Sequence, residues 1–109
     1  GVDAAVIDEH GVVSNETAAA MAGAVRRQFG ADIGVGITGV AGPEPHGGQP
    51  VGAICLGIET QSESYATGYT FAQTRAAIKA RAVTSALTLI RRATLGELMT
   101  GSSGVYRRL

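Results

Sequence analysis

The sequence predicts an α/β fold, in which a sheet carries helices on both of its faces. Three observations lead to that prediction. Apolar residues recur at helical spacing over residues 15–29 and 75–94. Residues 51–58 are apolar on both alternating faces, as expected of a central strand that is covered on both sides. Residues 65–71 alternate large and small side chains, which is typical of a strand.

The helices have recognisable starts and ends. Residues 3–9 begin with a capping aspartate and are followed by a glycine, which predicts a short helical turn. Ser14 is placed to cap the helix over 15–29, and Gly30 follows its end. Thr74 is placed in the same way before the long helix over 75–94.

The strands follow a simple order. Residues 31–38 alternate aliphatic side chains with glycines, and the glycine face would let a helix or a neighbouring chain pack closely. Residues 59–64 form a polar turn, so 51–58 and 65–71 are predicted to form an antiparallel hairpin. Three strands make a thin sheet, and residues 96–109 are expected to form a flexible or loosely docked tail.

Composition excludes several classes of protein. The 109 residues suffice for one domain, and nine basic residues balance nine acidic ones without a long basic run, which argues against nucleic acid as a partner. Arg26 and Arg27 complement the dipole of their helix, so we expect no ligand role for them. The single Cys55 excludes an intrachain disulfide and is interpreted as a buried structural thiol. No apolar run reaches bilayer length, so no membrane partner and a cytoplasmic location are expected.

Glycine is concentrated in the middle of the chain, where nine of the sixteen glycines lie between Gly30 and Gly57. Residues 34–39 match the pattern G-x-G-x-x-G, but that dinucleotide fingerprint requires a helix to open at its end. Pro43 and Pro45 follow instead, and they cannot begin a regular helix in that register. No lysine stands at P-loop spacing either, so both nucleotide motifs are excluded.

A more general role for this loop stays open. Exposed backbone amides are able to cradle a phosphate or a developing oxyanion, and here they would belong to Gly39, Gly42, Gly47 and Gly48. Thr38 would add a hydroxyl. The alternative is a long connection made flexible by glycine. His46 and His10 are interpreted as solvated surface residues.

The loop and its flanks resemble one known family. The run Thr-Gly-Val-Ala-Gly-Pro at 38–43, with Gly47-Gly48 and Pro50-Val-Gly52 behind it, is similar to the signature loop of the CinA C-terminal domain family, the nicotinamide mononucleotide deamidases. Residues 10–18 resemble the segment that leads into the family helix. Phe71, Arg75 and Ile78 resemble the entry to its last helix, so the resemblance covers about residues 1–95.

The resemblance implies a three-layer α/β/α sandwich with a mixed sheet, present here as a partial domain over 1–95 whose N-terminal strands are missing. The family hydrolyses the carboxamide of nicotinamide mononucleotide to nicotinic acid mononucleotide and ammonia. The resemblance further implies that the protein needs no metal or cofactor, that it binds a small nucleotide, and that it forms a homo-oligomer. Arg75 is the implied catalytic residue, and it would pair with the substrate phosphate or stabilise negative charge. The implied substrate-binding residues are Thr38, Gly39, Ala41, Gly42, Pro43, Gly47 and Gly48.

The sequence departs from the family pattern in two places. The segments that carry the family's candidate serine and tyrosine have no counterpart, and Ser14 and Tyr65 are not their equivalents. Residues 72–74 stand where the family often has Gly-Asp, and Lys79 stands where arginine is common. The leading hypothesis is therefore part of an amidohydrolase that lacks its nucleophile. The alternative is a domain that binds a nucleotide or assembles with copies of itself without catalysis.

Overall fold

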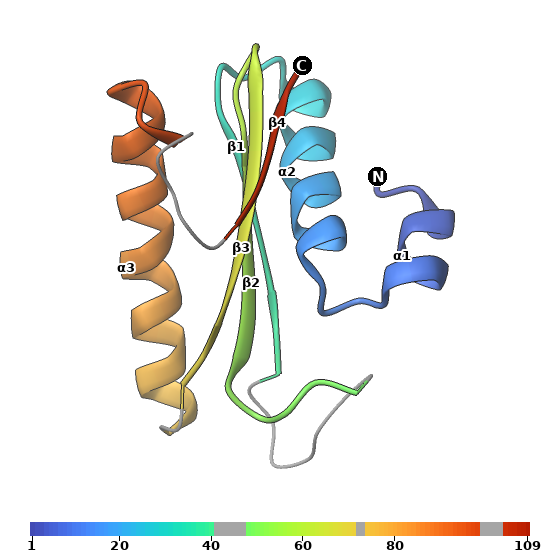
Figure 1. Ribbon diagram of the computed structural model, residues 1–109, viewed down its shortest axis with the longest axis vertical. Helices are drawn as coiled ribbons and strands as arrows, with labels where there is room; N and C mark the ends of the chain where they lie inside the picture. Colours follow the sequence, from blue (N-terminus) through green and yellow to red (C-terminus); the bar gives the residue numbers. More distant parts are fainter. Residues whose placement is uncertain (41–47, 72–73, 99–103) are drawn as a thin grey trace.

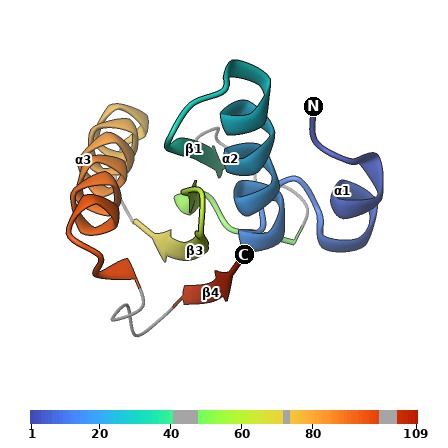
Figure 2. The ribbon, with the colours of Figure 1, turned by 90° about the horizontal axis from the view of Figure 1, so that it is seen from above.

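The computed structural model describes residues 1–40, 48–71, 74–98 and 104–109, and it has three layers (Figure 1). A four-stranded sheet forms the middle layer. Helix α3 (Arg75–Thr94) covers one face, and helix α2 (Asn15–Phe29) covers the other, with the short helix α1 (Ala4–His10) beside it. Figure 2 shows the same layers from above. The predicted α/β fold and its two helix layers are confirmed.

The sheet contains β1 (Gly34–Gly39), β2 (Ala53–Glu59), β3 (Glu63–Thr70) and β4 (Gly104–Arg108), in that spatial order. All pairings among these described strands are antiparallel, whereas the family resemblance implied a mixed sheet. The predicted hairpin is confirmed, because β2 and β3 pair through a three-residue turn. The sequence pattern did not predict β4, which lies within the expected tail and adds a fourth strand.

The helix caps are those that the sequence predicted. Ser14 Oγ accepts a hydrogen bond from the Thr17 amide at 3.1 Å, and Gly30 ends α2 with a φ of 61°. Thr74 Oγ1 accepts from the Ala77 amide at 3.3 Å. These bonds satisfy backbone donors that a helix start otherwise leaves open, which fixes where α2 and α3 begin.

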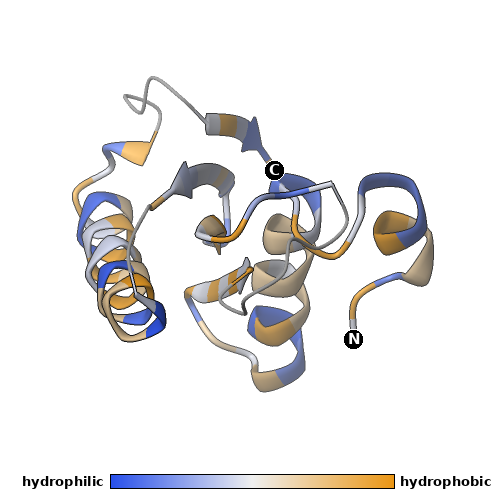
Figure 3. Ribbon diagram, turned by 90° about the horizontal axis from the view of Figure 1, so that it is seen from below, coloured by the Kyte–Doolittle hydropathy of each residue, from blue (hydrophilic) through white to orange (hydrophobic). Residues whose placement is uncertain are grey.

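The main core lies between the sheet and α3, where apolar side chains of β2 meet one stripe of the helix. The hydropathy colours of Figure 3 follow this pattern, with orange bands alternating along α3. The buried residues of that stripe are Ile78, Ala82, Ala86 and Leu89. Leu87, in the same helix, points outward and is 62% exposed. Leu98 follows α3 and is fully buried in the same core.

Helix α2 packs against a surface that we call the glycine seam, formed by Gly34, Gly36 and Gly57. A Cβ atom on any of the three would run into the backbone of α2 near Ala18 or Ala22. The close packing predicted for the glycine face of 31–38 is therefore confirmed, and its partner is a helix. These glycines serve helix packing rather than a ligand.

Charge is distributed unevenly over the layers. Helix α3 has five cationic residues and no acidic one, namely Arg75, Lys79, Arg81, Arg91 and Arg92. The first sixteen residues have no lysine or arginine and include four acids, namely Asp3, Asp8, Glu9 and Glu16. Because α1 and α3 lie on opposite sides of the sheet, the α3 side is basic, whereas the part of the opposite side around α1 is acidic.

Candidate functional site

The ends of five helices and strands lie together at one end of the sheet, the lower end in Figure 1. There β1 and β3 end, β2 begins, and both α2 and α3 have their first turns. The amino ends of the two long helices therefore point in the same general direction as the loop that joins β1 to β2. Such helix starts carry partial positive charge and unpaired N–H groups, which favour negative charge nearby.

The base of that loop is closed by backbone hydrogen bonds. The Val40 amide donates to the Ala53 carbonyl at 2.9 Å, and the Gly52 amide donates to the Val40 carbonyl at 2.7 Å. The Phe71 amide donates to the Gly52 carbonyl at 3.0 Å, which ties the loop to the end of β3. Gly52 has a φ of 92°, and a Cβ there would meet the backbone of Phe71. Glycine is thus required at this position.

Three of the predicted substrate-binding residues are described. Thr38 is half-buried, and its Oγ1 donates to the Val12 carbonyl at 2.9 Å, so it joins β1 to the segment before α2. Gly39 ends β1 opposite Ile54, and Gly48 lies in an exposed turn with a φ of 79°. Ala41, Gly42, Pro43 and Gly47 lie outside the described residues, as does His46.

Arg75 is the first residue of α3, and it is exposed. Its side chain makes no hydrogen bond or ion pair with any other residue that the structure describes. A cation in the first turn of a helix is disfavoured by the helix dipole, so Arg75 stands at an electrostatic cost. It belongs to the α3 layer, whereas Thr38 faces α2, so the two side chains reach the loop end from different faces of the sheet.

A pocket of about 400 Å³ opens on the α2 face, next to the base of the loop. Its walls come from the first turn of α2, the start of β2, the end of β3 and the residue after Gly48. The lining residues are His10, Ser14, Asn15, Glu16, Gln49, Ala53, Ile54, Cys55, Gly68, Tyr69 and Thr70. Arg75 and the described substrate-binding residues do not line it. Thr38 nevertheless stands beside it, because it pairs with Cys55 across β1 and β2.

Two polar groups of this pocket are buried. Burial raises the pKa of the Cys55 thiol, and the nearby Glu16 carboxylate raises it further. Asn15 Oδ1 is buried without a hydrogen-bond partner among the described residues. The hydroxyl of Ser14 is engaged as a cap and also donates to the Gly11 carbonyl at 3.0 Å. The buried thiol that we expected at Cys55 is confirmed, and none of these groups has the features of an activated nucleophile.

Sequence reasoning missed the pocket itself. It singled out the glycine loop but not Asn15, Gln49 or Cys55 as lining residues. Strand alternation offered one signal, because Thr38 and Cys55 point to the same face once the register between β1 and β2 is known. His10 was interpreted as a surface residue, and it is exposed, with carboxylates of Glu9 and Glu16 at 3.7 and 3.8 Å.

No group of three or more His, Cys, Asp or Glu side chains in the described part of the chain is arranged to hold a metal ion. No helix in that part is both long and apolar enough to cross a bilayer. The molecule is thus a three-layer α/β domain with a closed loop base, two helix starts and a polar pocket at one end of its sheet.

Residues 1–94 match the family model of the CinA C-terminal domain, and the chain belongs to that family. A CinA-like protein of Frankia casuarinae is 41% identical over 96 residues, which cover 88% of this chain and 22% of the relative. A protein of Lactiplantibacillus plantarum with the name competence-damage inducible protein is 43% identical over 93 residues, covering 84% of this chain and 22% of the relative.

Solved structures of the same superfamily have this fold. A CinA superfamily protein from Escherichia coli superposes with a TM-score of 0.78 at 28% identity, covering 84% of this chain and 54% of the other. A competence or damage-inducible protein from Enterobacter asburiae gives a TM-score of 0.79 at 28% identity, covering 85% and 59%. The chain thus spans just over half of these solved chains and about a fifth of the curated relatives.

Proposed function

We propose that this domain takes part in hydrolysing the carboxamide of nicotinamide mononucleotide, with nicotinic acid mononucleotide and ammonia as products. Family membership and the resemblance of the loop to the family signature support the proposal. The observation that carries it is the convergence of the loop base, the start of α2 and the start of α3 with Arg75 at one end of the sheet.

Each step of such a hydrolysis makes a demand on the protein. A nucleophile attacks the amide carbon, the carbonyl oxygen becomes an oxyanion in the tetrahedral intermediate, and ammonia leaves after gaining a proton. Backbone N–H groups of the loop around Gly39 and Gly48 would stabilise the oxyanion. Arg75 would bind the substrate phosphate through charge-assisted hydrogen bonds, which offsets the cost of a cation at a helix start.

We propose that the nucleophile comes from outside this chain, because neither candidate in the described part of the pocket suits that role. Cys55 is a poor candidate because its raised pKa keeps it as a thiol, and Ser14 is committed to capping α2. We propose that the chain supplies the substrate wall and the phosphate partner of a site that is complete only in a longer polypeptide, as the greater length of the solved relatives suggests.

The test uses a polypeptide that carries the complete domain, with ammonia release as the readout. Arg75→Ala should lower kcat/KM at least about tenfold, since it removes a charge-assisted contact. Arg75→Lys should recover part of the loss, because the charge is retained without the bidentate geometry. The matched control is Arg91→Ala, because Arg91 is an exposed arginine in the last turn of the same helix. Equal activity of the Arg75→Ala and Arg91→Ala variants would remove Arg75 from the mechanism.

A second function is favoured by the lack of an activated nucleophile in the described part of the pocket. In this alternative the chain binds a nucleotide or assembles with copies of itself without catalysis. A polypeptide that carries the complete domain separates the two, because the isolated 109-residue chain should release no ammonia in either case. Ammonia release by the longer polypeptide supports the hydrolase. A rise in melting temperature with nicotinamide mononucleotide and no ammonia supports binding alone. Light scattering then reports whether copies associate.

A further inference from the structure

A second cavity, of about 350 Å³, lies on the α2 face of the sheet. It extends from α1 and the start of α2 to the end of the sheet opposite the glycine-rich loop, and it is bounded by α2, β3 and β4. The lining residues are Val6, His10, Asn15, Glu16, Ala19, Ala20, Gly23, Arg27, Glu59, Ser64, Ala66, Val105, Arg107 and Leu109. Cationic side chains gather at the far end of this cavity.

The strand register places four residues in one row across the sheet at that end. Gly34 pairs with Glu59, Glu59 with Ser64, and Ser64 with Arg107. Directly paired residues of neighbouring strands point to the same face, and Glu59 faces α2, where it contacts Arg26. Ser64 and Arg107 therefore stand on the α2 face as well, consistent with their place in the cavity wall.

The ion pair between Arg26 and Glu59 neutralises the buried Glu59 carboxylate. Arg26 Nε donates to Glu59 Oε2 at 2.8 Å, and the Glu59 side chain is only 8% exposed. Arg27 Nη1 is 3.5 Å from the same oxygen, and its side chain is 64% exposed. Such a long, exposed contact is weak. Structural pairing with Glu59, rather than the helix dipole alone, thus explains Arg26, while Arg27 stays available.

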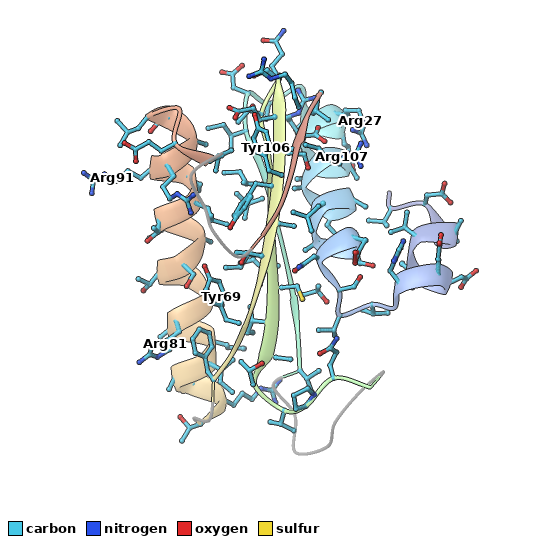
Figure 4. The ribbon with its side chains drawn as sticks, viewed as in Figure 1. Arg27, Tyr69, Arg81, Arg91, Tyr106 and Arg107 are labelled. Carbon is cyan, nitrogen blue, oxygen red and sulfur yellow. The ribbon has the colours of Figure 1, made fainter. Side chains whose placement is uncertain are left out.

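Arg107 is also available. It is exposed, and its guanidinium has no hydrogen bond or ion pair with another described residue. Figure 4 shows Arg27 on α2 and Arg107 on β4 at the same end of the molecule. Three guanidinium groups, those of Arg26, Arg27 and Arg107, stand against the Glu59 carboxylate and, in the 109-residue chain, the terminal carboxylate of Leu109. One positive charge is left in excess near the Ser64 hydroxyl. The other acid of this cavity, Glu16, lies at the start of α2, near the opposite end.

We propose that this end of the cavity binds a phosphate monoester whose body is small and apolar. The phosphate lies between Arg27 and Arg107 and accepts a hydrogen bond from the Ser64 hydroxyl. Arginine suits this role because its planar fork matches phosphate oxygens. Small side chains, Ala20 and Ala66 among them, line the adjoining wall and leave room for the organic body. The proposal is independent of the proposed amidohydrolase activity.

The experiment titrates phenyl phosphate into the 109-residue chain by calorimetry, with phenol as the uncharged comparison. Phenyl phosphate should bind and phenol should not. Arg27→Gln and Arg107→Gln should each weaken binding about tenfold, and the double variant should abolish it, because each removes a charge-assisted contact. Both side chains are exposed, so the variants should keep the wild-type melting temperature. In NMR spectra, the Ser64 amide should shift on titration.

Arg91→Gln, an exposed arginine of α3, is the matched control, and it should bind as the wild type does. Three results would overturn the proposal. These are no binding of phenyl phosphate to the wild-type chain, binding by the double variant as strong as by the control, and equal losses in all arginine variants. Inorganic phosphate alone should compete, since the phosphate group carries the recognition.

Discussion

At the scale of single residues, Cys55 combines burial with an acidic neighbour. Its side chain lies on β2, where it lines the pocket and packs in a small buried cluster with Val13, Ala18, Val40 and Ala53. Burial is the larger cause of its raised pKa, followed by Glu16. Both effects disfavour the thiolate, which is the reactive form of cysteine. A thiol in this position stays protonated at neutral pH, which suits a structural role.

We expect Cys55 to react slowly with the thiol reagent DTNB at pH 8 in the folded chain, and quickly in urea. Glu16→Gln should speed the reaction of the folded chain, because it removes the carboxylate that disfavours the thiolate. The folded state holds the Cys55 proton more tightly than the unfolded state. This stabilisation is therefore complete below the ordinary pKa of 9.0 and is lost as pH rises through the folded-state pKa.

Urea melts between pH 7 and 10 measure that dependence, with Cys55→Ser as the reference that lacks the titrating thiol. Labelling of the folded chain as fast as that of the unfolded chain would contradict the prediction.

Glu59 illustrates what a single sequence does not reveal. It was predicted to open a polar turn, because a carboxylate after an apolar run ordinarily marks the end of a strand. In the structure it is the last residue of β2 and is buried beneath Arg26, a residue 33 positions earlier. Pairing over that distance depends on how α2 lies across the sheet, which no local pattern records.

At the scale of elements, the glycine seam fixes the distance between α2 and the sheet. We expect Gly36→Ala to destabilise the chain by about 1–3 kcal/mol, the usual cost of inserting a methyl group into a packed interface. A Cβ there would lie 2.5 Å from the Ala18 carbonyl oxygen, and a helix backbone has little freedom to move away. The measurement is the free energy of unfolding in urea, and Gly57→Ala should behave alike.

Gly68→Ala is the matched control on the same face. There a Cβ would be 3.5 Å from its nearest neighbour, which is ordinary contact, so this variant should be neutral or slightly more stable. If Gly36→Ala proves as stable as Gly68→Ala, the seam is not the constraint on α2 that its geometry implies.

The elements differ in how far sequence could predict them. The bounds of α2 and α3 were predicted correctly because Ser14 and Thr74 are caps, and a cap is a local signal. The strand at Gly104–Arg108 was missed because it follows a Gly/Ser-rich run and holds only five residues. Its pairing with β3 is supported by Tyr106, whose hydroxyl donates to Glu63 at 2.9 Å, a contact 43 positions apart. Of the candidate site, the loop was found from its glycines, but the pocket beside it required the registers of β1, β2 and β3.

At the scale of the whole molecule, charge is balanced in sum but not in space. The formal net charge is zero, yet the acids of the first sixteen residues and the cations of α3 lie on opposite sides of the sheet. We expect the chain to be retained by both anion and cation exchangers at pH 7 and low salt. Replacing Lys79 and Arg91 by glutamine should abolish retention on the cation exchanger only, and Asp8→Asn with Glu9→Gln should do so on the anion exchanger only. Passage of the wild-type chain through both columns would contradict this.

The separation of acidic from basic residues also affects how other molecules interact with this chain. Helix α2 and the sheet separate α1 from α3, and each layer is about 10 Å thick, whereas the Debye length at physiological ionic strength is about 8 Å. A partner that approaches one side is therefore screened from the charges of the other. Although the formal net charge is zero, the chain presents an acidic surface around α1 and a basic surface along α3.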